Sequence, residues 1–196
     1  MEMQTVDSVF HEIRQILGVG VGVGAVNQTT TTAAPKLPSN DEVASWLSAL
    51  RGGDLQIPWS AEELRLYGSE ASLEGGQIGY RIDTAGKRLP NWPDDWVVLG
   101  EISGDPIIGR VGENGCAILF ARHGSGPWRA NMVSDDTAAF AVALRTWCDL
   151  FVRRYSKDIY DDTLAVRPDF LAELRQQVNQ TLSNSETDVF MSMVDG

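Results

Sequence analysis

The fold is decided by the stretch that begins at Trp96 and ends at Arg122, WVVLGEISGDPIIGRVGENGCAILFAR. It contains three short apolar runs, at 96–102, 107–111 and 116–122. The turn signals SGDP and GENG separate them, and runs bounded by Gly, Pro and Asn in this way are typical of β-strands. Because neither connection is long enough for the crossover that parallel strands need, the strands are predicted to be antiparallel.

The same pattern extends to both sides of this stretch. Further strands are predicted from Gln77 to Ile82 and from Trp128 to Val133. A helix is predicted from Asp135 to Tyr155, because apolar residues recur there at helical spacing. The members of this stripe are Phe140, Leu144, Trp147, Cys148 and Phe151. Together these elements predict an α+β fold, in which a central, mainly antiparallel sheet of about five to six strands packs against helices.

Three helices are predicted in the part of the sequence that precedes the strands. Apolar residues at helical spacing indicate an amphipathic helix from about Thr5 to Leu17. A second helix is expected from Asp41 to Arg51, with Asn40 or Asp41 as its N-cap and Gly52-Gly53 beyond its end. The sequence Ser60-Ala-Glu-Glu63 has the form of a capping box, which predicts a short helix through Tyr67.

The chain is predicted to be organised in three segments. Residues 1–36 combine the first helix with a linker, since 18–24 alternate Gly and Val and are followed by a Thr-rich run. Residues 37–155 form the α+β domain. Residues 156–196 form a C-terminal extension with a helix from Pro168 and a polar tail from Ser183. We expect the apolar face of the first helix to dock on its own domain or on a second copy of the chain.

The charge balance is strongly acidic. There are 27 Asp and Glu against 16 Lys and Arg, which gives a formal net charge of -11. Affinity for nucleic acid comes largely from Lys and Arg that neutralise phosphates, so nucleic acid is not expected as the main partner. The same field favours encounter with a basic protein, although it also serves solubility alone.

Neither a metal nor a cofactor is expected. The two cysteines, Cys116 and Cys148, lie in apolar stretches, have no metal-binding spacing and are too few for a disulfide scaffold. The glycines at 18–24 do not form the G-x-G-x-x-G motif and follow a helical pattern instead of a strand. The sequence has no signal-peptide pattern at its start and no long apolar run, so we expect a cytoplasmic protein without a membrane partner.

Catalysis is not expected, although three residues could form an acid–base site. His123 opens a Gly-rich turn, and Glu101 and Asp105 lie close enough in sequence to form an acid–base site with it. No Ser, Cys or second His completes a nucleophile arrangement with them. A small hydrolase that uses His123 and Asp105 is therefore kept as a rival interpretation, and a surface or turn role for His123 is preferred.

Three stretches, taken in order, resemble the SUKH superfamily, which includes the Smi/Knr type of cell-wall assembly regulator. The first is Leu37-Pro38 before a helix that ends in LRGGD, and the second is WVVLGEISGDP at 96–106 with the strand that follows. The third is CAILFARHG at 116–124, followed by Trp128 and a helix with Phe140 and Leu144. The resemblance covers about residues 37–152 and departs from the family at Arg51, where Asn is common.

The resemblance implies an α+β fold and a non-catalytic role. Bacterial members are mostly immunity proteins, which bind and neutralise a cognate toxin, often a nuclease, and fungal members are regulatory scaffolds. We therefore expect a protein-binding module that neutralises a basic toxin, with a scaffold that has no toxin partner as the alternative. An acidic inhibitor is physically sensible here, because nucleases need basic surfaces to hold phosphates.

The partner-binding residues are predicted around the strand and turn that carry the resemblance. Acidic side chains gather there, and tryptophans beside them are either apolar anchors for a partner or part of the core. The predicted set is Trp92, Asp94, Asp95, Glu101, Asp105, His123 and Trp128.

Overall fold

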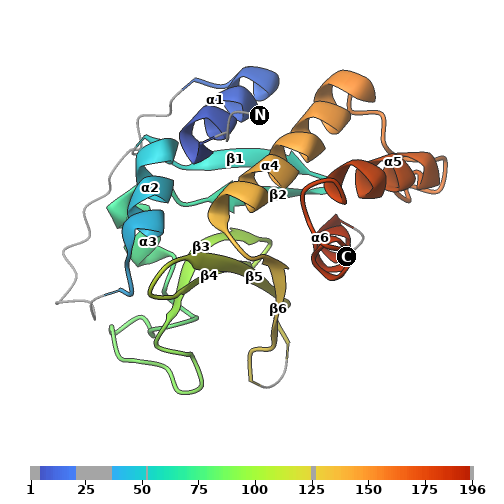
Figure 1. Ribbon diagram of the computed structural model, residues 1–196. Coiled ribbons are helices and arrows are strands. Elements are labelled where there is room, and N and C mark those ends of the chain that lie inside the picture. Colours follow the sequence, from blue (N-terminus) through green and yellow to red (C-terminus); the bar gives the residue numbers. More distant parts are fainter. Residues whose placement is uncertain (1–4, 21–36, 52, 125–126, 195–196) are drawn as a thin grey trace.

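The computed structural model describes residues 5–20, 37–51, 53–124 and 127–194. Within them lies a six-stranded sheet of order β1-β2-β3-β4-β5-β6, in which every neighbouring pair is antiparallel (Figure 1). The strands are β1 Leu55–Trp59, β2 Glu62–Leu66, β3 Trp96–Ile102, β4 Asp105–Val111, β5 Cys116–Ala121 and β6 Ala130–Ser134. The predicted α+β class with a central antiparallel sheet is confirmed, and four of the predicted strands are present as β3 to β6.

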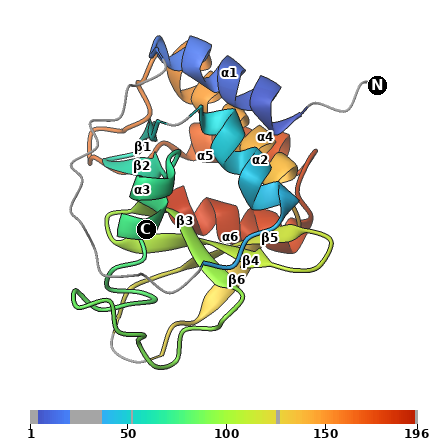
Figure 2. The ribbon, with the colours of Figure 1, turned by 90° about the vertical axis from the view of Figure 1, so that its left-hand side faces the viewer.

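Helices cover this sheet mainly from one side. Figures 1 and 2 show α1, α2 and α4 together above β3 to β6, while the segment that follows α3 extends away from these helices. The helices are α1 Val6–Leu17, α2 Asp41–Leu50, α3 Glu70–Gly75, α4 Thr137–Cys148, α5 Pro168–Val178 and α6 Asn184–Val194, and the π-helix η1 Asp149–Arg154 continues α4. The helices predicted at Thr5, Asp41, Asp135 and Pro168 are all present, with bounds that differ by a few residues.

The predicted helix at residues 60–67 is wrong, because this segment belongs to a β-hairpin. Leu55, Ile57 and Trp59 alternate with exposed residues along β1, and Trp59 pairs with Glu62 across a two-residue turn. Ser60 has a φ of 52° in that turn, which is incompatible with an N-cap in extended conformation. The alternation of period two therefore decides the local structure, and the capping-box pattern is incidental.

The predicted strand from Gln77 to Ile82 is also wrong. Turns and two isolated bridges replace it, and Gly79 has a φ of 89° that a regular strand does not allow. Gln77 is fully buried, and its side-chain amide pairs with the backbone of Val98 through bonds of 2.9 and 3.0 Å. The Gln77 side chain therefore satisfies the backbone N–H and carbonyl of Val98 beside the bulge of β3. It takes the place of the backbone pairing that a further strand would supply.

Helix α2 begins as predicted and ends differently. The Asn40 side chain accepts bonds from the Glu42 and Val43 amides, as an N-cap does, and also donates to the carbonyls of Gly112 and Gly115. At the other end Arg51 itself adopts the left-handed conformation, with a φ of 57°. The predicted glycine cap is therefore replaced by Arg51, and Gly52 lies outside the described residues.

Helix α1 packs against α2 and α4. The ring of Phe10 is fully buried and meets that of Trp46 edge to face, with centroids 5.0 Å apart. Arg14 is also buried, and its guanidinium donates to the carbonyl of Leu50 at 2.7 Å near the end of α2. The first helix is thus docked on its own domain, and most of the predicted linker lies outside the described residues.

The C-terminal segment shares the same core. Trp59 on β1 contacts Trp147 on α4 with ring centroids 4.4 Å apart, and these rings contact Phe190 on α6 and Phe170 on α5. The tail from Ser183, predicted as polar, forms α6, whose side chains at 190, 191, 193 and 194 are buried. Buried residues of all three predicted segments belong to one core. The division of the chain into three segments stays a prediction.

Candidate functional site

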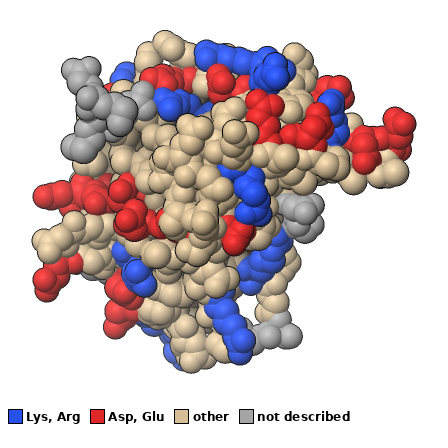
Figure 3. Space-filling model, turned by 45° about the vertical axis from the view of Figure 1, so that its right-hand side comes forward, with Lys and Arg blue, Asp and Glu red and all other residues tan. Residues whose placement is uncertain are grey.

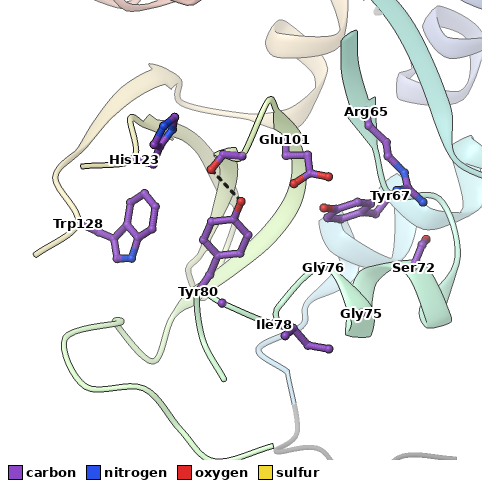
Figure 4. A pocket seen from close by; sticks show the side chains of 12 residues that line it. Arg65, Tyr67, Ser72, Gly75, Gly76, Ile78, Tyr80, Glu101, His123 and Trp128 are labelled. Carbon is purple, nitrogen blue, oxygen red and sulfur yellow. Dashed lines mark hydrogen bonds between the residues drawn. The ribbon is translucent and has the colours of Figure 1, made fainter. Parts of the chain in front are cut away.

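A groove of about 610 Å³ opens on the face of the sheet that the main helical layer leaves free (Figure 4). We call it the tyrosine groove. Residues from β2, α3, the turn after α3, β3 and the ends of the β5–β6 connection line it. Its principal side chains are Arg65, Tyr67, Tyr80, Glu101, His123 and Trp128.

Strand pairing directs two charged side chains into this groove. Arg65 on β2 lies directly opposite Glu101 on β3. Their neighbours Leu64 and Ile102 are buried in the core, and side chains alternate along a strand, so Arg65 and Glu101 point to the other face. The Arg65 guanidinium donates two bonds to Asp54, of 2.9 and 2.6 Å, whereas Glu101 makes no ion pair with any described residue.

Tyr67 lies between this pair and α3. A Cβ atom added to Gly76 would come within 2.1 Å of the Tyr67 ring, so the absence of a side chain at Gly76 makes room for it. Burial, followed by the charge of Glu101, raises the pKa of the Tyr67 hydroxyl. A tyrosine with its ordinary pKa of about 10 is already protonated at neutral pH, and this shift keeps the hydroxyl a donor at higher pH as well. In Figure 4 it points toward the Glu101 carboxylate.

Aromatic rings form the other wall. The hydroxyl of Tyr80 donates to the carbonyl of Gly104 at 2.9 Å, and its ring contacts Trp128 with centroids 5.5 Å apart. Burial and the nearby Glu101 raise the pKa of Tyr80 to about 12. Trp92 lies behind both rings and is only 4% exposed. Trp92 therefore supports the wall from the interior, and Trp128 is the half-buried member that faces the groove.

His123 and Asp105 meet at the edge of the groove. One carboxylate oxygen of Asp105 accepts the backbone N–H of His123 at 2.7 Å and also contacts its ring Nδ1. Arg122 lies 3.6 Å from the second oxygen. Asp105 is 7% exposed, while the His123 side chain is 69% exposed. The carboxylate thus fixes the chain that leaves β5 and orients the imidazole outward.

The chemistry available to this pair is limited. A catalytic histidine oriented by an aspartate needs a nucleophile or a bound substrate at its far nitrogen. Among the described residues, no Ser, Thr or Cys side chain is hydrogen-bonded to His123. Burial raises the pKa of Cys116 and of Cys148 to about 12, so neither thiol supplies a thiolate. The described ranges also contain no group of three or more residues suited to hold a metal ion.

On the face that Figure 3 shows, the acidic side chains do not form one continuous patch. In Figure 3, acidic side chains stand in separate groups near the margins, and uncharged atoms with several Lys and Arg occupy the middle. Asp94 is exposed and pairs with Arg88. Local geometry, and not net charge, is therefore what marks the tyrosine groove as a candidate site.

The structure brings together some of the predicted partner-binding residues and separates others. Glu101, His123 and Trp128 line the groove, and Asp105 lies directly behind His123. Asp94 and Asp95 lie on the loop before β3, outside the groove lining. The sequence interpretation missed Arg65, Tyr67 and Tyr80, and the only local signal for them is the Gly75-Gly76 pair, which permits close approach of a ring.

No family model, curated protein or solved structure matches the chain. Within the part of the chain that the structure describes, every helix is too short or too polar to cross a membrane.

Proposed function

We propose that this chain is a protein-binding module that acts without chemistry and holds a basic protein partner against the tyrosine groove. The observation that carries the proposal is the carboxylate of Glu101, which has no ion-pair partner in the described residues and lies between Tyr67 and Tyr80. A carboxylate in a partly desolvated, aromatic setting attracts a cation more strongly than one in open water.

The resemblance to the SUKH superfamily supports a particular partner. It implies an immunity protein that neutralises a toxin, and a nuclease toxin carries the basic surface that a net charge of -11 would attract. A cytoplasmic site of action agrees with the two free cysteines. The alternative within the same class is a regulatory scaffold of the Smi/Knr type, which has no toxin partner.

The test is binding to the product of the adjacent gene, since an immunity gene is expected beside its toxin gene. Association rates would be measured across a salt series, because the Debye length falls to about 8 Å at physiological salt. We expect the on-rate to fall as salt rises. Absence of binding to the neighbouring product would overturn the immunity role and leave the scaffold.

A matched pair of variants locates the face. Glu101→Gln and Glu113→Gln change the net charge equally, but Glu113 is exposed in the β4–β5 turn, away from the groove lining. We expect Glu101→Gln to weaken binding at least about tenfold, chiefly through faster dissociation, and Glu113→Gln to change it about twofold or less. Equal effects would contradict the groove as the binding face.

The rival function is a small hydrolase, and the contact between His123 and Asp105 is the observation that favours it. Its discriminating test is the variant His123→Ala in an assay with ester and phosphodiester substrates. Turnover that His123→Ala abolishes would establish the hydrolase in place of the binding module.

A further inference from the structure

We propose that the tyrosine groove binds the guanidinium of a single arginine side chain, supplied by the partner. This inference rests on the proposed function and deepens it, since it names the chemical group that the groove selects. Three observations carry it: a carboxylate that has no ion-pair partner among the described residues, the two protonated phenols, and the aromatic wall.

The charged side chains of the groove favour a cation. The groove contains Arg65 and Glu101 on paired positions, but the guanidinium of Arg65 is held by Asp54 at 2.6 Å. The charge of Arg65 is therefore already compensated by a carboxylate outside the groove lining. The Glu101 carboxylate is hydrogen-bonded to the Tyr67 hydroxyl and is attracted to Arg65 across the strand pair, but it forms no ion pair among the described residues. Its charge can therefore still attract a cation from outside.

The shape of the groove favours a guanidinium over an ammonium group. A guanidinium is planar, so it can donate two bonds to a carboxylate while its face lies on an aromatic ring, whereas an ammonium group is a compact, strongly hydrated charge. The ring of Tyr80 lies beside Glu101, and the ring of Trp128 lies on the far side of Tyr80 and extends this wall (Figure 4). The carboxylate and the rings together therefore suit arginine better than lysine.

The groove already holds one guanidinium in this manner. The Arg65 guanidinium lies over the ring of Tyr67, 5.5 Å from its centroid, while Asp54 accepts its hydrogen bonds. Glu101 and the neighbouring ring of Tyr80 repeat this combination of carboxylate and aromatic face, and no guanidinium of the described residues forms an ion pair with Glu101.

The tyrosine hydroxyls add selectivity. Tyr80 donates its hydrogen to Gly104, and Tyr67 is protonated at neutral pH, where even a tyrosine of ordinary pKa keeps its proton. Neither phenol therefore adds negative charge at neutral pH. The groove holds one carboxylate that makes a hydrogen bond with Tyr67 but has no ion-pair partner among the described residues, so it favours a positive group over a neutral or acidic side chain.

The experiment uses the full chain and three small probes: acetyl-arginine amide, acetyl-lysine amide and acetyl-citrulline amide. Citrulline keeps the planar shape and loses the charge. Each is titrated while the indole N–H signal of Trp128 is followed by NMR. We expect saturable shifts with arginine at a Kd on the order of millimolar, at least about fivefold weaker binding of lysine, and no saturation with citrulline.

Two variants test the site itself. Glu101→Gln should abolish the arginine response, and Glu113→Gln should leave it intact. Trp128→Leu should weaken it several-fold, which provides a second variant if Glu101→Gln fails to fold. Equal binding of arginine and lysine, or an arginine response that survives Glu101→Gln, would overturn the inference.

The outcomes separate this inference from the function on which it rests. If the adjacent gene's product binds through the groove but acetyl-arginine amide gives no saturable shift, the inference fails and the proposed function stands. If the amide binds but no basic protein is held at the groove, the proposed function fails and the arginine site remains.

Discussion

The backbone N–H of His123 donates a 2.7 Å hydrogen bond to the carboxylate of Asp105, and the His123 ring contacts the same oxygen atom. Asp105 is the first residue of β4, and His123 follows the end of β5. One buried side chain thus joins the beginning of one strand to the chain that leaves the next.

We therefore expect Asp105→Ala to lower the free energy of unfolding by about 1–3 kcal/mol, because the partly buried N–H of His123 loses its acceptor. His123→Ala should cost less than about 0.5 kcal/mol, since its ring is mostly exposed. Urea unfolding measures both. Asp105→Asn retains one acceptor oxygen and should fall between them, so a loss equal to that of Asp105→Ala would contradict the role of the acceptor.

A stabilising substitution is predicted at Arg51. This residue caps α2 in the left-handed conformation, which costs a non-glycine residue free energy, and its ion pair with Asp7 is solvent-exposed. Arg51→Gly should raise the free energy of unfolding by about 0.5–1 kcal/mol. Asp7→Ala is the control for the lost ion pair. If Arg51→Gly destabilises while Asp7→Ala does not, the left-handed strain is not the dominant effect.

The first helix is predicted to contribute to global stability. Phe10 is fully buried against Trp46, so Phe10→Ala should cost roughly 3–5 kcal/mol. Gln15→Ala, on the exposed side of α1, should cost less than about 0.5 kcal/mol. Thermal or chemical unfolding of both variants checks this. A small loss for Phe10→Ala would mean that α1 detaches without affecting the rest of the fold.

The sheet could be predicted from sequence where the pattern is local. Strands β3, β4 and β5 are joined by short turns, β5 and β6 by a longer connection, and each of these strands pairs with its neighbour in sequence. The β1–β2 hairpin is hidden in the sequence because Ser60 and Glu63 match a helix signature, although Leu55, Ile57 and Trp59 alternate with exposed residues before the turn. Two local patterns compete there, and packing of the alternating side chains into the core decides between them.

The candidate site could be predicted only in part. Glu101, His123 and Trp128 can be predicted from their place around one strand and its turns. Tyr67 and Tyr80 cannot be predicted in this way. Tyr67 reaches the groove because Gly76 allows close approach to its ring, and Tyr80 reaches it from a turn. Neither feature leaves a periodic signal in the sequence. A groove built from segments about 60 residues apart depends on the tertiary structure.

The two thiols are predicted to be unreactive in the folded protein. Cys116 and Cys148 are fully buried, and burial raises the pKa of each to about 12, so almost no thiolate exists at pH 8. A chromogenic disulfide reagent should label both rapidly in denaturant and neither on the same timescale without it. Fast labelling of one thiol in the native protein would show that its surroundings open locally.

Asp54 is predicted to link stability to acid pH. Burial alone would raise its pKa, but hydrogen bonds from Ser72, Gly68 and Arg65 hold the pKa below its ordinary value. A carboxylate with a lower pKa in the folded state stabilises the fold fully above the unfolded-state pKa of about 3.9. That contribution is lost as the pH falls through the folded-state pKa.

The wild-type protein should therefore exceed Asp54→Asn in stability at pH 6, and the difference between them should shrink as the pH falls from about 5 to about 3. Asp162→Asn, an exposed position, is the matched control and should stay close to the wild type throughout. Urea unfolding at each pH gives the free energies. A deficit of Asp54→Asn that is the same at every pH would assign the effect to packing or to the neutral hydrogen bonds, because only the ionised carboxylate makes the stabilisation depend on pH.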